Sequence, residues 1–351
     1  MSAVNKVKKA VRMDWRSIIG LLRQMKKESG RGFADLFADM KRCYETRGFT
    51  WRNYATFGFH MLTDVAIRDT YISQSETDDI TGLVNSPESY AVLRDKGKAA
   101  RQFKPYFRRD FFDLREGSAE QFDQFVKKHD VLFAKYVGQM LSRGIERFKT
   151  AEIEDTKALY DRLKAAGKYL VEEGIVQHPE MARLSLDSVN TMRIATCRHT
   201  DGTVTVPYVT LRTNLVDGYF DNTAFKGAWT PIQNFKSVTH PFYNNSRSII
   251  HIHEHPTTKF KYVGFEIPFI EESMEMVKAA ADLLPEARYI GWDVAVTPDG
   301  PLVVEANYTP TPEYYQIYGM MKDNIGFAAV LEKALGMPVT RPHRKAAGMS
   351  R

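Results

Sequence analysis

The sequence predicts an α+β fold in which a helical N-terminal region precedes two mixed lobes. Three observations support this division. Apolar residues follow helical spacing up to about residue 95, short strands and helices alternate after Lys96, and strand patterns dominate the second half of the chain. With 351 residues, of which 43% are hydrophobic and 26% charged, the chain can bury the core of one large domain or of two joined lobes.

We expect four segments along the chain: a helical region over residues 1–85, a smaller lobe over 86–185, a larger lobe over 186–340 and a basic tail over 341–351. No stretch approaches the roughly 20 apolar residues that a transmembrane helix needs. No apolar signal core precedes a small-residue cleavage site. Cys43 and Cys197 are the only cysteines, which argues against a disulfide framework. These observations predict a cytoplasmic protein.

The first 27 residues are basic and follow a helical pattern. They hold eight lysines and arginines against one aspartate, which already exceeds the net charge of +6 for the whole chain, so the remainder is close to neutral. Such localised charge argues against nucleic-acid binding. Apolar residues recur every three or four positions, namely Val4, Val7, Val11, Trp15, Ile18, Leu22 and Met25.

Two interpretations of this helix remain open. In one, residues 4–27 lie on an anionic membrane surface, anchored by Trp15 and the lysines, which places the protein at the inner face of the membrane. In the other, which we favour, the apolar stripe packs on the following helices. Those helices offer Phe33, Leu36, Phe37 and Met40 as partners.

Local signals mark helix starts in the first half of the chain. Ser86 is a typical N-cap before Pro87, which suits the first helical position. Ser118 and Gln121 form a capping-box pattern. Residues 131–137 form a short apolar run that contains one lysine.

The second half of the chain is rich in strand patterns. The Asp201-Gly202 and Asp299-Gly300 pairs predict hairpin turns. Helical spacing covers residues 271–284, ahead of Pro285. Strand patterns cover residues 191–198, 203–212, 248–253, 289–296 and 302–307.

An acidic pair near the end of the chain predicts a metal site. Two strands joined at the second turn would run antiparallel and bring Asp293 alongside Glu305 and Asn307, which lie two residues apart and share one strand face. Two carboxylates and an amide oxygen suit Mg²⁺, which takes its remaining ligands from water and phosphates. Apolar residues surround these acids, and an unpaired carboxylate there would be costly. We therefore favour a metal site over a hairpin with solvated acids.

The order of these motifs resembles that of ATP-grasp proteins. Asp293, Glu305 and Asn307 resemble the magnesium motif of that superfamily, and the pattern from about residue 85 to 315 is similar to the sugar-transfer associated ATP-grasp family. The resemblance implies an ATP-grasp fold, in which two α+β lobes grip ATP. Walker A and Gly-x-Gly-x-x-Gly patterns are missing from the sequence. The matching segments are 170–179 (LVEEGIVQHP), 188–193 (SVNTMR), 212–214 (RTN), 221–222 (DN), 255–256 (HP), Gly264 and 290–293 (IGWD).

The resemblance assigns ATP-binding roles to the smaller lobe. Lys96 and Lys135 match the two lysines that approach the ATP phosphates. Lys135 stands within an apolar strand and needs an anionic partner there. Residues 138–144 match the loop that covers the phosphates, although only Gly138 and Gly144 remain of its glycines.

The adenosine part of ATP has its own expected contacts. Val171, Glu172 and Glu173 match the hinge that hydrogen-bonds adenine in the family. Glu180 matches the acid that binds the ribose hydroxyls. Both assignments follow from the resemblance.

The resemblance also assigns catalytic and substrate residues to the larger lobe. Asn190, Arg193 and Arg212 are expected at the triphosphate or the forming acyl phosphate, where the planar guanidinium suits charge spread over phosphoryl oxygens. The residues expected to position the substrate are Thr191, Asn214, Asp221, Asn222 and His255.

Three alternating histidines offer a different metal site. His251, His253 and His255 would share one strand face and could mimic a zinc site, but no thiolate or carboxylate at a suitable spacing completes a tetrahedral set. We prefer a structural or substrate-side turn at His255-Pro256.

The family resemblance implies ATP- and Mg²⁺-dependent ligation through an acyl phosphate. The partners would be a small-molecule or glycan carboxylate and an amine-type nucleophile. Family context points to the synthesis of cell-surface polysaccharides or sugar conjugates. Two alternatives remain: an ATP-grasp kinase that phosphorylates a hydroxyl, and a non-catalytic membrane-peripheral partner of glycosyltransferases.

Overall fold

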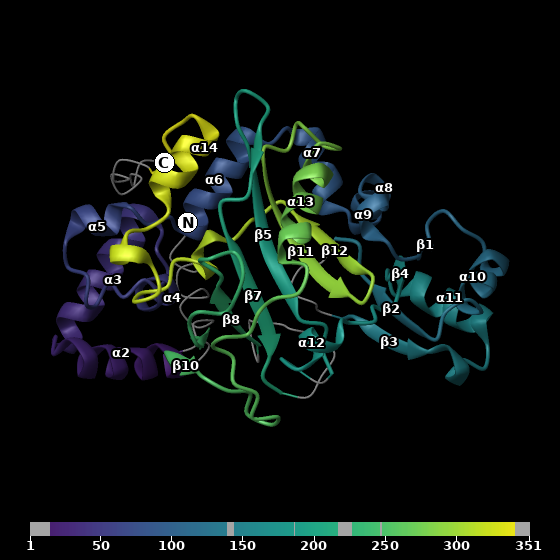
Figure 1. Cartoon of the computed structure of the whole chain (residues 1–351), viewed down its shortest axis with the longest axis horizontal. Coiled ribbons are helices and arrows are strands. Elements are labelled where there is room, and N and C mark those ends of the chain that lie inside the picture. The colour runs from purple at the N-terminus through teal and green to yellow at the C-terminus, as the bar shows by residue number, and fades with distance from the viewer. Residues whose placement is uncertain (1–14, 139–143, 186, 217–226, 246–247, 341–351) are drawn as a thin grey trace, which may run out of the picture.

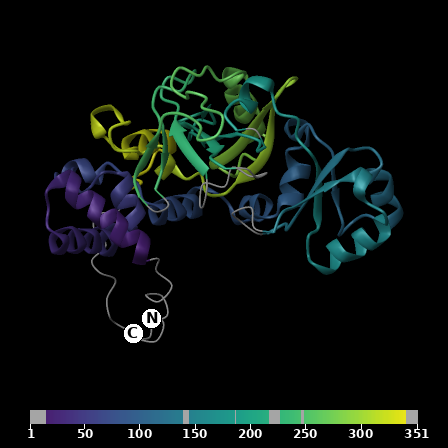
Figure 2. The ribbon, with the colours of Figure 1, turned by 90° about the horizontal axis from the view of Figure 1, so that it is seen from below.

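The computed structural model describes residues 15–138, 144–185, 187–216, 227–245 and 248–340. Within this part of the chain, a helical region and a four-stranded sheet lie on opposite sides of an eight-stranded sheet (Figures 1 and 2). The mixture of helices and antiparallel sheets confirms the expected α+β fold with a helical N-terminal region.

The helical region contains α2 (Trp15–Ser29), α3 (Phe33–Arg47), α4 (Trp51–Thr56), α5 (Val65–Asp69) and α6 (Gln74–Val84). Ile18, Leu21 and Met25 of α2 are buried in one core with Leu36 and Phe59. The apolar stripe of the first helix therefore packs on its neighbours over the described residues. Residues 4–14 lie outside them, so the membrane interpretation stays a prediction.

Two of the expected packing partners are placed differently. Phe33 and Phe37 are 45% and 47% exposed, whereas Leu36 and Met40 are buried. Helical geometry explains the difference, because α3 presents Leu36, Met40 and Cys43 to the core along one stripe and turns the two phenylalanines towards its edge.

The helices α7 (Pro87–Arg94), α8 (Lys96–Gln102) and α9 (Lys104–Phe107) lead into the smaller sheet. The side chain of Ser86 caps α7 and that of Ser118 caps α10, as expected. The smaller sheet has the order β1-β4-β2-β3, with all neighbours antiparallel. Its elements are β1 (Phe111–Asp113), α10 (Ala119–Val126), β2 (Val131–Lys135), β3 (Glu146–Lys149), η1 (Thr150–Glu152), α11 (Thr156–Ala165) and β4 (Leu170–Glu173).

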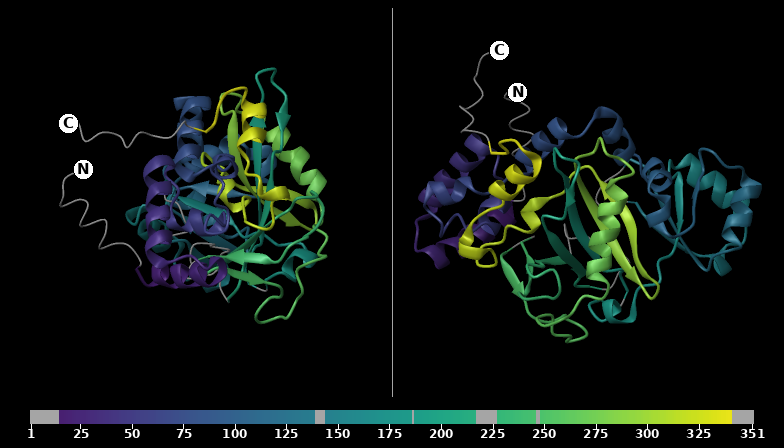
Figure 3. Two further views of the ribbon diagram at one scale, coloured as in Figure 1. Left: turned by 90° about the vertical axis from the view of Figure 1, so that its left-hand side faces the viewer. Right: turned by 45° about the horizontal axis from the view of Figure 1, so that its top comes forward.

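The larger sheet has the order β10-β9-β8-β7-β5-β11-β12, and β6 pairs with β5. Its strands are β5 (Thr191–Arg198), β6 (Val204–Thr205), β7 (Val209–Asn214), β8 (Gly227–Pro231), β9 (Phe242–Asn244), β10 (Ile250–Ile252), β11 (Tyr289–Thr297) and β12 (Gly300–Asn307). Helix α13 (Ile270–Ala281) lies on one face of this sheet (Figure 3). The remaining elements are α12 (Pro179–Ala182), η2 (Pro312–Tyr314), η3 (Lys322–Asn324) and α14 (Ala328–Leu335).

Several boundaries differ from the sequence expectation. The strand expected over residues 203–212 is divided into β6 and β7, because Pro207 lacks the N–H that a continuous ladder needs. Helix α13 ends at Ala281, three residues earlier than expected. The hairpin loop between β11 and β12 consists of Pro298 and Asp299, while Gly300 begins β12 with a φ of 108°.

The segment that follows β12 returns to the helical region. The Gln316 side chain accepts a hydrogen bond from the backbone of Ile72 at 3.0 Å and donates one to it at 2.9 Å. The backbone N–H of Gly326 donates to the Thr70 hydroxyl at 2.7 Å. These contacts join the segment that follows β12 to the connection between α5 and α6.

The contact at Gly326 gives a test of this docking. An added Cβ would lie 2.4 Å from the carbonyl oxygen of Thr70, so backbone must shift. We expect Gly326→Ala to lower the free energy of unfolding by about 1 to 3 kcal/mol in chemical denaturation. Gly82→Ala is the control, because Gly82 lies in α6 with no atom within 4 Å of the added carbon and should be neutral or stabilising. Equal stability of the two variants would contradict this packing.

Candidate functional site

One face of the larger sheet collects the charged residues of the expected site. Asp293 on β11 lies opposite Glu305 on β12 and opposite Arg193 on β5. Arg212 on β7 lies opposite Thr191 on β5. Cross-strand partners share a face, so four adjacent strands direct these side chains to the same side of the sheet.

Asp293 is held between two arginines. Arg193 donates through Nε to Oδ1 at 2.6 Å and lies 3.3 Å from Oδ2 through Nη2, while Nη2 of Arg212 lies 2.9 Å from Oδ1. Asp293 is buried, which by itself would raise its pKa, but the two arginines outweigh burial and hold the pKa below its usual value. The Asn307 amide lies 3.4 Å from Oδ2.

The two expected lysines both meet carboxylates. Lys96, at the start of α8, places Nζ 2.6 Å from Glu305. Burial lowers the Lys96 pKa, but the nearby carboxylates outweigh burial and the pKa is raised. Lys135, at the end of β2, forms an ion pair with Glu172 of β4. The expected anionic partner of Lys135 is therefore Glu172 in this structure.

Glu172 has a second cationic partner that the sequence did not indicate. Nη2 of Arg109 lies 3.2 Å from Glu172, and both side chains are almost fully buried. Burial alone would raise the pKa of Glu172, but Arg109 and Lys135 lower it to about 2. Arg109 stands between Arg108 and Asp110 in the sequence. Only the tertiary structure reveals its burial.

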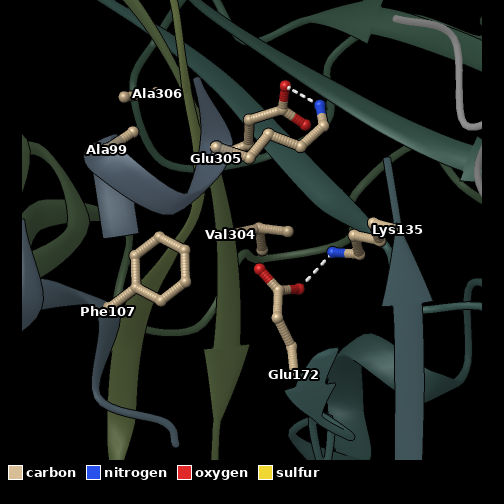
Figure 4. A pocket seen from close by; sticks show the side chains of 8 residues that line it. Ala99, Phe107, Lys135, Glu172, Val304, Glu305 and Ala306 are labelled. Atoms are coloured by element: carbon tan, nitrogen blue, oxygen red, sulfur yellow. Dashed lines mark hydrogen bonds and ion pairs between the residues drawn. The ribbon is translucent and has the colours of Figure 1, made fainter. Parts of the chain in front are cut away.

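A pocket lies between the two sheets at this point. It encloses about 230 Å³ including its open mouth. Figure 4 shows Glu305 and Glu172 on either side of Val304, each in an ion pair. The charged groups of this pocket are paired with one another. It is lined by Lys96, Ala99, Phe107, Lys135, Glu172, Val304, Glu305 and Ala306.

Asn190 and Thr191 serve the structure of the strand start. The Asn190 amide donates to Gln177 at 3.1 Å and to the Met181 carbonyl at 2.9 Å, and its oxygen accepts from Thr213 at 2.7 Å. Asn190 is fully buried and is not one of the residues that line the pocket. Its contact with phosphates stays a prediction. Thr191 accepts from Nη2 of Arg212 at 2.7 Å and so orients that arginine.

The expected hinge residues lie deep in the smaller sheet. Val171 and Glu172 belong to β4, which pairs with β1 on one side and β2 on the other. Their backbone groups therefore take part in the ladder. The backbone N–H of Glu173 donates to the Asp110 carbonyl at 3.0 Å. Glu180 is exposed and pairs with Arg183.

The expected substrate residues are dispersed. Asn214 is buried at the end of β7, and its side-chain oxygen accepts from the backbone of Leu215 at 3.0 Å. His255 is buried in a turn, where Nδ1 accepts from the backbone of Thr258 at 3.1 Å. Asp221 and Asn222 lie outside the described residues, as do residues 139–143 of the expected phosphate loop.

The described residues contain no group of three or more His, Cys, Asp or Glu side chains placed to hold a metal ion. A cation at Asp293 and Glu305 would therefore take further ligands from Asn307, water or phosphate. Nor does that part of the chain contain a helix long and apolar enough to cross a membrane.

Residues 131–323 match the model of a family described as sugar-transfer associated ATP-grasp. The chain belongs to this family. The match runs from β2 into η3, and so includes Lys135, Glu172 and Asp293. Among curated proteins the comparison finds no match.

Several solved structures are similar to this ATP-grasp chain at low identity. The ATP-grasp ligase PsnB, in complex with a phosphomimetic variant of its minimal precursor, Mg and ADP, is 12% identical over 72% of this chain and 57% of its own, with a TM-score of 0.38. The D-alanine–D-alanine ligase from Bacillus anthracis is 13% identical over 66% of this chain and 61% of its own, with a TM-score of 0.40. The chain thus spans about three fifths of these proteins. The family assignment rests on the family match.

Glu172 gives this ATP-grasp protein a testable pH dependence. Its pKa is lowered from 4.5 to about 2, so its stabilising effect is fully present above about pH 4.5 and is lost as the pH falls through 2. We expect Glu172→Gln to be less stable at pH 7 by about 3 to 5 kcal/mol, because Lys135 and Arg109 lose a buried partner. In chemical denaturation, this difference should shrink as the pH falls from 4.5 towards 2.

The control is Glu180→Gln. The Glu180 side chain is 52% exposed, and its replacement should change the free energy of unfolding by less than about 0.5 kcal/mol at every pH. A stability difference at Glu172 that stays constant across this pH range would contradict the pairing.

Proposed function

We propose that this protein binds ATP with Mg²⁺ and joins a carboxylate to an amine or related nucleophile through an acyl phosphate. The charge balance of the site carries this proposal. Five cationic side chains meet three carboxylates there, which leaves two positive charges in excess. Magnesium-bound ATP carries about two negative charges, so it would neutralise the site. The cations are Lys96, Lys135, Arg109, Arg193 and Arg212.

The lysines are placed to exchange their partners. Lys96 and Lys135 reach the pocket from α8 and β2, and each holds a carboxylate there. A triphosphate in the pocket would offer them anionic oxygens of higher charge. Both lysines would then turn to phosphate without leaving a buried ammonium unpaired.

Asp293, Glu305 and Asn307 fit a magnesium ion. Asp293 and Glu305 are cross-strand neighbours, and Asn307, which donates to Asp293 through Nδ2, would turn its amide to offer the oxygen. These are hard oxygen donors of the kind that Mg²⁺ selects, and magnesium when bound would neutralise charge on the phosphates. Arg193 and Arg212 hold Asp293 in this structure, and they would orient phosphoryl oxygens when a cation takes that carboxylate.

The proposed reaction has two steps. An oxygen of the substrate carboxylate attacks the γ-phosphorus of ATP, the bond to the bridging oxygen breaks, and ADP leaves with the electron pair. The nucleophile then attacks the acyl carbon, phosphate leaves, and the nucleophile gives up a proton. Arg193 and Arg212 would stabilise the negative charge that develops on the transferred group.

The family description supports a sugar-linked substrate. We infer that the carboxylate belongs to a small molecule or a glycan, such as a uronic acid, and that the product serves cell-surface polysaccharides or sugar conjugates. We further propose a cytoplasmic site of action, with residues 4–27 as the segment to test for membrane contact. Thr191, which we expect to position the substrate, would do so indirectly, because it orients Arg212.

The first test is ADP release with Mg-ATP over a panel of uronic acids, sugars and amino acids. We expect turnover that needs both a carboxylate and an amine and that disappears in Asp293→Asn. Hydroxylamine should trap the acyl phosphate as a hydroxamate. Phosphorylation of a sugar hydroxyl without hydroxamate would favour the kinase alternative, and ATP binding without any turnover would favour a non-catalytic role.

The second test concerns Lys135. We expect Lys135→Met to weaken ATP binding by about 10- to 100-fold in calorimetry, because a charge-assisted contact to phosphate is lost. Lys149→Met is the matched control, since Lys149 lies on the neighbouring strand β3 with its side chain 59% exposed. Equal ATP affinity of the two variants would contradict the role of Lys135.

A further inference from the structure

The position of Glu305 depends on an irregularity in β12. The two-residue loop of the hairpin sets a register in which Thr297 faces Gly300 and Val294 faces Val303. That register would place Asp293 opposite Val304. Instead Asp293 faces Glu305, because the register shifts by one residue. Val304 is thus the extra residue of a β-bulge.

The bulge decides which face of the sheet Glu305 occupies. Side chains alternate along a strand, so a one-residue change of register moves each of them to the opposite face. Without the extra residue at Val304, Glu305 and Asn307 would point away from Asp293. The three expected metal ligands share a face only because of the bulge.

Arg109 holds this bulge from outside the sheet. Its Nη1 donates to the Val303 carbonyl at 2.7 Å and its Nη2 to the Val304 carbonyl at 2.9 Å. Consecutive carbonyls of a regular strand point in opposite directions, so a single guanidinium can take both only where the strand is bulged. β12 is the edge strand of its sheet, and the ladder offers these carbonyls no neighbour on that side.

The same guanidinium also holds the carboxylate of the other lobe. Nη2 of Arg109 lies 3.2 Å from Glu172, and the group stacks 3.8 Å from the ring centre of Phe107. The Arg109 side chain is only 3% exposed. One buried side chain therefore links the metal-ligand strand β12 to Glu172, which is the partner of Lys135.

We infer that Arg109 is a positioning residue that maintains the bulge at Val304 and keeps Glu172 paired when Lys135 turns to the phosphates of ATP. This inference rests on the proposed function. Lysine at position 109 keeps a charge for Glu172 but cannot span both carbonyls. Methionine there removes both contacts. The two roles can thus be separated.

The experiment measures ATP affinity by calorimetry with and without Mg²⁺. We expect Arg109→Lys to keep the magnesium-free affinity and to lose about 10- to 100-fold in the gain that Mg²⁺ provides. Arg109→Met should weaken both. In Arg109→Met, Glu172 has lost its other partner and holds Lys135 away from the phosphates. Adding Glu172→Gln should release Lys135 and restore the magnesium-free affinity. It should not restore the gain in affinity that Mg²⁺ provides. A purely structural role would not give this selective rescue.

Arg108→Met is the control, because Arg108 is the exposed neighbour in the same turn. It should match the wild-type chain in both measurements, and melting curves check that each variant is folded. Unchanged ATP and Mg²⁺ affinities in Arg109→Met, or no rescue by Glu172→Gln, would overturn the inference alone. A wild-type chain that binds no ATP would overturn the proposed function and this inference together.

Discussion

A carboxylate removed from water is stabilised by a neighbouring cation, and three carboxylates paired in this way join the elements of this fold. Asp293 and Glu172 are buried, whereas the Glu305 side chain is 33% exposed. Asp293 connects β11 to the arginines of β5 and β7, and Glu305 connects β12 to Lys96 at the start of α8. Glu172 connects the smaller sheet to Arg109. Breaking the pairs of Asp293 or Glu172 from one side leaves a buried charge, which is far more destabilising than replacing both partners. The spatial relation of the two sheets near the pocket follows from these pairs.

The same constraint explains why the pocket is suited to an anionic ligand. Each cation pairs with a carboxylate, which carries one negative charge, whereas a polyphosphate carries several negative charges and would attract the cations more strongly. Two of the three carboxylates have two cations each, so one cation can leave while the other stays. In the proposed function, a phosphate could therefore take one cation from Asp293 or from Glu172 without leaving that carboxylate unpaired.

The sequence predicted those parts of the site that depend on local pattern. Two-residue spacing placed Glu305 and Asn307 on one strand face, and the hairpin turn brought them to the strand that carries Asp293. The isolated lysine in an apolar run predicted an anionic partner for Lys135. The sequence did not reveal the bulge at Val304, because a valine pair looks the same in regular and bulged strands. It did not reveal Arg109 either, since the contacts that bury this residue come from elements about 60 and 190 residues away. Asn190 fitted the family pattern, but its hydrogen bonds hold the strand start.

The strand order of the smaller sheet also limits how far the chain can be shortened from its N-terminal side. The family match begins at residue 131, which is the first residue of β2. A fragment with that start would lack β1 and would leave β4 as an open edge, where strands of other copies can pair and aggregate. It would also lack Lys96 and Arg109. The segment that matches the family and the segment that can fold alone therefore have different boundaries in this protein. A fragment that is to fold alone must begin upstream of α8.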